Sequence, residues 1–104
     1  MNRYKFTPQA VDDLFEIWTY IARDSVAAAD RVEDAVYKAC DFLADGRFRG
    51  SIREDLTKLP LRFWIIPDFT NFIIVYDPES DPLRIIRILH GRRDILAVLG
   101  EPKP

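Results

Sequence analysis

The sequence predicts an α+β fold in which an N-terminal strand and an α-helical hairpin pack on a small antiparallel sheet, with a short C-terminal helix. Two observations carry this prediction. Apolar residues recur at helical spacing through residues 8–45, and three segments rich in Ile, Val and aromatic residues lie within residues 61–90. A chain of 104 residues has room for one modest core, so we predict one domain over residues 1–100 and a flexible tail over 101–104.

Residues 3–6 are predicted to form the first strand, and two helices are predicted to follow. Thr7 suits the N-cap of the first helix and Pro8 its first helical position. Ser25 suits the N-cap of the second helix, and Gly46 can end it. One apolar stripe on each helix is expected to face the core: Val11, Leu14, Phe15, Trp18, Ile21 and Ala22 on the first, and Ala29, Val32, Val36, Ala39 and Leu43 on the second. The very short connection between them favours an antiparallel hairpin.

The second half of the chain is predicted to form the sheet. Strands are expected over residues 61–66, 72–76 and 83–90, and the short separators 67–71 and 77–82 favour antiparallel pairing in a meander. The segment 72–76 is apolar at every position, which suits a central strand. Strand alternation places Arg87 on one face with Leu83 and Ile85, and Arg84 on the other face. Residues 95–99 are expected to form the last short helix.

Charge is distributed unevenly along the chain. Residues 1–45 carry five basic and nine acidic side chains, whereas residues 46–104 carry ten basic and eight acidic ones. Four arginines and one acidic residue fall within residues 83–94, although the net charge of the whole chain is −2. Because arginine suits carboxylate and phosphate recognition, we expect this end of the sheet to meet an acidic partner.

The composition is that of a folded, soluble protein of the cytoplasm. The sequence is 48% hydrophobic and 31% charged, which is unlike a disordered chain. Its single cysteine, Cys40, cannot form an intramolecular disulfide and is expected to be buried. Neither a secretory leader nor a membrane-spanning segment is expected. We also predict no metal site and no cofactor.

Several segments together resemble the RelE/ParE toxin superfamily, and its ParE branch in particular. The matching segments are FTPQA at 6–10, DLFEI at 13–17, YIA at 20–22, GSIREDL at 50–56 and RILHGRRD at 87–94. The resemblance implies a RelE/ParE-like fold and a toxin of a type II toxin–antitoxin module. It also implies a cognate ParD-like antitoxin, whose flexible tail wraps the toxin and neutralises it in a hetero-oligomer. No sequence-specific DNA binding is expected of this chain alone.

The resemblance leaves the target open between DNA gyrase, which ParE relatives inhibit, and mRNA on the ribosome, which RelE relatives cut. RNA cleavage through the 2′-OH needs a base, a cation for the phosphate and an acid. RelE-type nucleases tend to carry an arginine where this chain has Asn71, and many carry a tyrosine soon after the position of Asp94, where this chain continues with Ile95. We therefore predict a gyrase inhibitor that blocks replication and is not an enzyme.

Two alternatives stay open: a ribosome-dependent mRNA endonuclease that uses His90, Arg62 and Arg93, and an inactive homologue that acts only as an antitoxin-bound operon regulator. In the favoured interpretation the residues predicted to bind the target are Arg84, His90, Arg92 and Arg93. Those predicted to bind the antitoxin are Trp18, Arg53, Arg62, Trp64 and Arg87. Several of these have a purely structural alternative: Trp18 fits the core stripe, His90 can cap a turn, and Arg53 or Arg92 can pair with a neighbouring acid.

Overall fold

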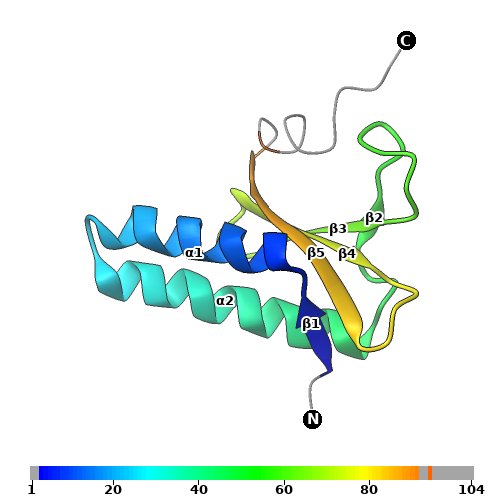
Figure 1. Ribbon diagram of the computed structural model, residues 1–104, viewed down its shortest axis with the longest axis horizontal. Coiled ribbons are helices and arrows are strands. Elements are labelled where there is room, and N and C mark those ends of the chain that lie inside the picture. The colour runs from blue at the N-terminus through cyan, green and yellow to red at the C-terminus, as the bar shows by residue number, and fades with distance from the viewer. Residues whose placement is uncertain (1–2, 92–93, 95–104) are drawn as a thin grey trace.

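A computed structural model describes residues 3–91 and 94, and Figure 1 shows two helices lying on one face of a single sheet. The predicted helix at 95–99 and tail at 101–104 lie outside the described residues. The elements, in chain order, are β1 Tyr4–Phe6, α1 Pro8–Ala22, α2 Val26–Asp45, β2 Ser51–Ile52, β3 Arg62–Ile65, β4 Phe72–Asp77 and β5 Leu83–His90.

The caps of both helices lie where the sequence predicts them. The Thr7 hydroxyl accepts a hydrogen bond from the amide of Ala10 at 3.1 Å, and the Ser25 hydroxyl accepts one from Ala28 at 3.1 Å. Gly46 is the C-cap of α2. The Thr7 hydroxyl also donates to the carbonyl of Ile86 at 2.7 Å, so the first helix is capped and fixed to β5 by the same side chain.

The sheet has the strand order β1-β5-β4-β3-β2, and β3, β4 and β5 pair antiparallel as predicted. β1 differs, because it pairs with β5 in parallel, and the complete sheet is mixed. No tight turn joins these two strands, so their relative direction is set by the path of the chain between them, which includes both helices and β2 to β4. The short strand β2, which the sequence pattern does not indicate, adds an edge beside β3.

A β-bulge interrupts β5 and changes which side chains share a face. Val75 pairs with Arg87 while Tyr76 pairs with Ile85, so Ile86 is an extra residue on β5. The predicted alternation is therefore wrong beyond this point. Leu83 and Ile85 lie in the core beneath the helices, whereas Val75, the partner of Arg87, belongs to the cluster on the opposite face.

The core has one apolar cluster on each face of the sheet. The larger cluster lies beneath the helices, and the smaller one on the opposite face comprises Leu56, Leu61, Phe63, Val75 and Leu89. The α2 stripe is buried as predicted, and Cys40 is fully buried beside it. The α1 stripe is only partly correct, because Leu14 is buried whereas Val11 is 53% exposed and Phe15 is 68% exposed. The apolar stripe of α1 is therefore wider than the part of the helix that the sheet covers.

Candidate functional site

Arg87 is held by a partly buried ion pair at the bulge. Its Nε and Nη2 atoms each donate to a carboxylate oxygen of Asp13 on α1 at 2.7 Å, and the amide of Ile88 donates to the same carboxylate at 3.0 Å. The Asp13 side chain is only 12% exposed. Its hydrogen bonds raise the pKa of Arg87. Arg87, predicted to contact the antitoxin, is thus engaged inside the molecule.

Two further arginines predicted to contact the antitoxin also have partners in the chain. Arg53 makes two hydrogen bonds to Asp55, at 2.9 and 2.7 Å. Arg62 donates to the carbonyls of Phe48 and Gly50 at 3.0 and 2.7 Å, and its guanidinium lies 5.1 Å from the centroid of the Phe48 ring. The Arg62 contacts hold the loop between α2 and β2, and the Arg53–Asp55 pair lies in the loop that follows β2.

His90 lies exposed at the end of β5. Its ring meets the ring of Phe72 edge-on, with centroids 5.1 Å apart, and its backbone amide donates to Asp94 at 2.9 Å. Arg84, which was predicted to bind the same target, lies near the other end of β5, about 20 Å away at the usual rise of a strand. The other two residues predicted to bind the target, Arg92 and Arg93, lie outside the described residues.

The sheet does not bring Arg62 close to His90. Arg62 pairs with Tyr76 and His90 with Phe72, so the two residues lie two strands apart and four positions apart along β4. Usual strand dimensions give a separation of about 16 Å between their backbones. Trp64 lies nearer to His90, because it pairs with Ile74, only two positions from Phe72.

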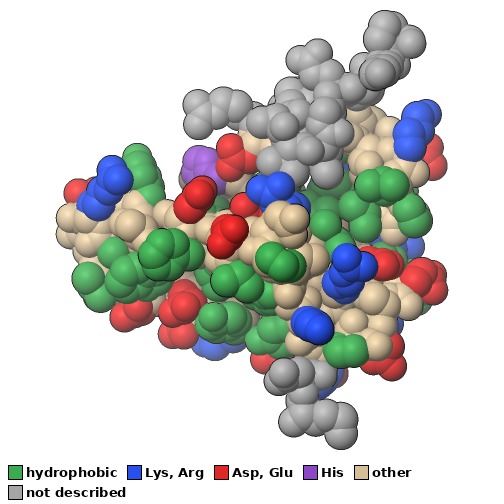
Figure 2. Space-filling view, viewed as in Figure 1, with side chains coloured by type: hydrophobic (Ala, Val, Ile, Leu, Met, Phe, Trp, Pro, Cys, Tyr) green, Lys and Arg blue, Asp and Glu red, His purple; other side chains and the backbone are tan. Residues whose placement is uncertain are grey.

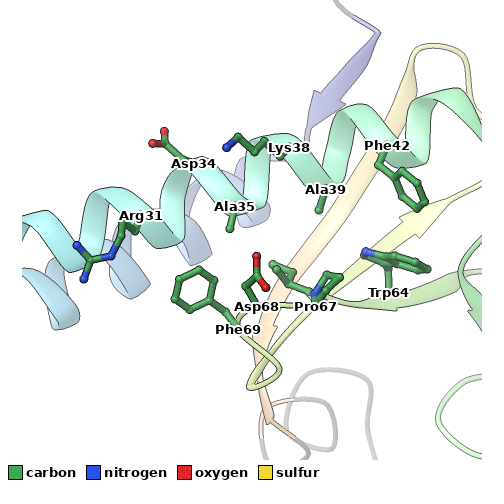
Figure 3. Close-up of a pocket in the computed structure, with 11 residues that line it drawn as sticks. Arg31, Asp34, Ala35, Lys38, Ala39, Phe42, Trp64, Pro67, Asp68 and Phe69 are labelled. Carbon is green, nitrogen blue, oxygen red and sulfur yellow. The ribbon is translucent and has the colours of Figure 1, made fainter.

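A groove of about 530 Å³ separates α2 from the turn between β3 and β4, and we call it the α2–sheet groove (Figure 3). Phe42 from α2 and Trp64 from β3 point toward each other, with ring centroids 5.3 Å apart. Arg49 covers Phe42 at 4.0 Å from the ring centroid. The lining residues are Arg31, Asp34, Ala35, Lys38, Ala39, Phe42, Trp64, Ile66, Pro67, Asp68 and Phe69. The groove is therefore an aromatic hollow with both signs of charge at its rim.

A second groove, of about 350 Å³, runs between α1 and α2 on the outer side of the hairpin, and we call it the hairpin groove. Figure 2 shows hydrophobic side chains gathered over the hairpin with acidic side chains beside them. The lining residues are Phe6, Val11, Leu14, Phe15, Trp18, Asp30, Glu33 and Tyr37. The indole of Trp18 donates to Asp30 across the groove at 3.0 Å, so this tryptophan bridges the helices.

The two tryptophans predicted to bind the antitoxin thus lie in different grooves, and sequence reasoning missed most of their neighbours. Phe42 and Tyr37 are exposed aromatic residues outside the buried stripe of α2, and Phe15 belongs to the predicted core stripe of α1. Aromatic residues outside a helix's apolar stripe are a usable signal of a contact surface. The position of Phe69, in a turn, offers no comparable signal.

Within residues 3–91 and 94, no group of three or more His, Cys, Asp or Glu side chains is placed to hold a metal ion. Within those residues, too, neither helix has the length and apolar character needed to cross a bilayer.

Comparison with known proteins gives a consistent result. The model of the family described as "ParE toxin of type II toxin-antitoxin system, parDE" matches residues 4–95. The chain is also similar to a solved structure described as the chromosomal ParDE TA system from P. aeruginosa, with a TM-score of 0.68 and 19% sequence identity. That likeness covers 86% of this chain and 95% of the other. No curated protein matches the sequence.

Proposed function

The chain belongs to the ParE toxin family of type II toxin–antitoxin systems. On this basis we propose that it acts in the cytoplasm, where it stops cell growth by binding DNA gyrase and blocking replication. The single observation that carries the proposal is the family match over residues 4–95. ParE relatives are gyrase inhibitors. The activity proposed for this chain is likewise binding to gyrase, with no reaction catalysed by the toxin itself.

The geometry of the nuclease candidates supports this choice. General acid–base cleavage needs the base and the phosphate-binding cation within hydrogen-bond reach of one substrate. Arg62 and His90 are about 16 Å apart by strand dimensions, and Arg62 is occupied by two backbone carbonyls. We therefore assign Arg62 to the structure of the loop, and His90, together with Arg92 and Arg93, to contact with gyrase.

Neutralisation is proposed to occur at the α2–sheet groove. A bulky apolar side chain of a ParD-like antitoxin would fill the hollow between Trp64 and Phe42, where burial of aromatic area gives most binding energy. His90 lies on the same face of the sheet as Trp64, about 12 Å away by strand dimensions. An antitoxin in this groove would stand close to the proposed gyrase contact, which gives a steric reason for neutralisation.

Two assays with purified components, one of gyrase and one of translation, test the proposal. In a supercoiling assay, the toxin is expected to inhibit gyrase and to accumulate cleaved DNA, and translation reactions with mapped mRNA ends are expected to show no new cuts. Cleaved mRNA that disappears in His90→Ala would instead support the endonuclease alternative. Inactivity in both assays, with the antitoxin still bound, would support the operon-regulator alternative.

A further inference from the structure

Residues 46–62, which lead from the end of α2 into β3 and which we call the basic segment, carry an excess of positive charge. The segment holds five basic and two acidic side chains, so its net charge is +3 in a chain whose net charge is −2. Two of the five basic side chains pair with acidic residues. The other three, none of which forms a salt bridge with a described residue, are Arg49, Lys58 and Arg62. Their charge predicts an anionic partner.

Arg49 and Arg62 are each fixed against a phenylalanine. The Nη1 atom of Arg49 donates to the carbonyl of Phe42 at 2.8 Å, and its guanidinium lies 4.0 Å from the centroid of that ring. Arg62 makes the same two contacts with Phe48, because its Nη1 donates to that carbonyl at 3.0 Å and its guanidinium lies 5.1 Å from the ring centroid. A guanidinium held by a carbonyl and a ring keeps its full charge and has little conformational freedom left to lose on binding.

Both guanidiniums keep one edge available to an anion. Among the described residues each donates through Nη1 alone, so Nε and Nη2 remain for an outside acceptor. A pair of guanidinium N–H groups matches two oxygens of a phosphate or a carboxylate. Arg49 is exposed, and Phe48, which lies against Arg62, is 55% exposed. The two arginines therefore have the chemistry of a phosphate-binding surface.

We propose that Arg49 and Arg62 contact the phosphate backbone of the DNA that gyrase holds while the toxin is bound to the enzyme. The inference rests on the proposed function, because gyrase brings the DNA to the toxin. Duplex DNA presents a dense row of phosphates, and contacts to phosphate carry no sequence information. The contact is therefore independent of DNA sequence, and two phosphate contacts without the enzyme give only weak binding.

The position of the two arginines fits a contact beside gyrase. Arg62 lies on the same face of the sheet as His90, about 16 Å away by strand dimensions, because their β4 partners Tyr76 and Phe72 both belong to the cluster beneath the helices. A toxin that meets gyrase at His90 thus presents Arg62 on the same side. Arg49 covers a ring of the α2–sheet groove, so an antitoxin in that groove would stand beside the DNA contact as well.

The experiment measures the affinity of the labelled full-length toxin for gyrase by fluorescence anisotropy, with and without a linear DNA duplex bound to the enzyme. The wild type is expected to bind the gyrase–DNA complex more tightly than gyrase alone, and this difference is expected to shrink as the salt concentration rises. Arg49→Gln is expected to weaken binding to the gyrase–DNA complex by about tenfold and to leave the affinity for gyrase alone unchanged. Arg49→Lys, which keeps the charge but loses the planar fork, is expected to fall between the two.

The matched control is Arg23→Gln. The guanidinium of Arg23 also lies near an aromatic ring, 5.9 Å from the centroid of Tyr20, but it follows α1 at the tip of the helical hairpin, far from β2 (Figure 1). This variant is expected to bind gyrase like the wild type, with and without DNA. Circular dichroism melting checks that each variant is folded.

Three outcomes count against these proposals, and they can be told apart. Equal affinity of the wild type for gyrase with and without DNA overturns the inference. If Arg49→Gln weakens antitoxin binding and leaves the effect of DNA intact, the inference is also overturned, and the two arginines belong to the contact with an acidic segment of the antitoxin. If the wild type does not bind gyrase at all, the proposed function itself fails.

Discussion

Asp13 shows how much one side chain can organise in a small domain. Its carboxylate accepts hydrogen bonds from the guanidinium and the neighbouring backbone of a strand 74 and 75 positions further along the chain. It thereby pairs with Arg87 and satisfies the Ile88 amide, at an edge of β5 that β1 does not cover. Sequence reasoning assigned Arg87 to a partner because the pattern of charges along a chain does not show which acid approaches from another element.

Arg87→Ala is expected to lower the free energy of unfolding by about 2 kcal/mol, because it leaves the Asp13 carboxylate largely buried without its cation. Urea denaturation followed by circular dichroism measures the change. The matched control is Arg84→Ala on the same strand, whose exposed side chain should matter by less than about 0.5 kcal/mol. Equal losses in the two variants would contradict the role of the Asp13 pair.

Gly50→Ala is expected to be more destabilising than Gly46→Ala. A Cβ atom at Gly50 would lie 2.6 Å from the hydroxyl of Tyr76, which is fully buried and accepts the Gly50 amide at 2.8 Å. The three atoms closest to a Cβ atom at Gly46 all belong to the flexible side chain of Arg49, which can move away. Thermal unfolding of both variants tests this order, and a lower melting temperature for Gly46→Ala would refute it.

Cys40 is predicted to be inert in the native protein. Burial raises the pKa of its thiol to about 12, so the reactive thiolate is scarce in the folded state at neutral pH. Iodoacetamide should therefore label Cys40 only after urea is added. Because the folded pKa exceeds the ordinary value of 9.0, the thiol's contribution to stability is complete below pH 9 and decreases above it, as the unfolded thiol ionises. Cys40→Ala should show a smaller loss of stability over that alkaline range.

At the scale of elements, the sequence was most informative where local chemistry decides the outcome. Thr7, Ser25 and Gly46 mark helix ends because hydroxyl caps and glycine act on backbone groups next to them in the chain. The bulge at Ile86 was not predictable, because residues 83–90 read as one uninterrupted strand and the extra residue is seen only in the pairing with β4. The parallel pairing of β1 with β5 was not predictable either, because it too is seen only in the pairing between distant segments.

Loss of the Thr7 cap should therefore cost more than loss of the Ser25 cap. Ser25→Ala removes one hydrogen bond at the start of α2, worth about 1 kcal/mol. Thr7→Ala removes the corresponding cap of α1 and also leaves the Ile86 carbonyl without its donor, for about 2 kcal/mol in total. Chemical denaturation of the two variants gives the comparison. Thr7→Ser, which keeps the hydroxyl, should recover most of the loss.

The candidate surfaces were only partly predictable, because exposure depends on which elements leave a residue uncovered. Trp64 was singled out from the sequence, and the structure places it in a groove with Phe42. Phe15 was expected in the core because it shares the apolar stripe of α1, yet its side chain is left largely exposed. The periodicity of a single helix reports how wide its apolar face is, and its neighbours decide how much of that face they cover.

For the molecule as a whole, antitoxin binding and gyrase binding should be separable by mutation. Trp64→Ala is expected to weaken antitoxin binding by at least about tenfold while gyrase inhibition stays intact, so cells that carry the antitoxin should stop growing. His90→Ala is expected to impair gyrase inhibition and leave antitoxin affinity near that of the wild type. Assays with purified components measure antitoxin affinity and gyrase inhibition, and growth curves measure the effect on cells. Parallel losses in both activities from either variant would argue against two distinct surfaces.

The pairing of β1 with β5 has a consequence for folding during translation. Among the described residues β1 pairs only with residues 83–85, so the sheet stays incomplete until β5 has left the ribosomal exit tunnel. A nascent chain that stops early lacks that partner and cannot present the finished surface. Products truncated before β5 are therefore expected to be inactive, because the surfaces proposed to bind gyrase and the antitoxin form only once that strand has been made.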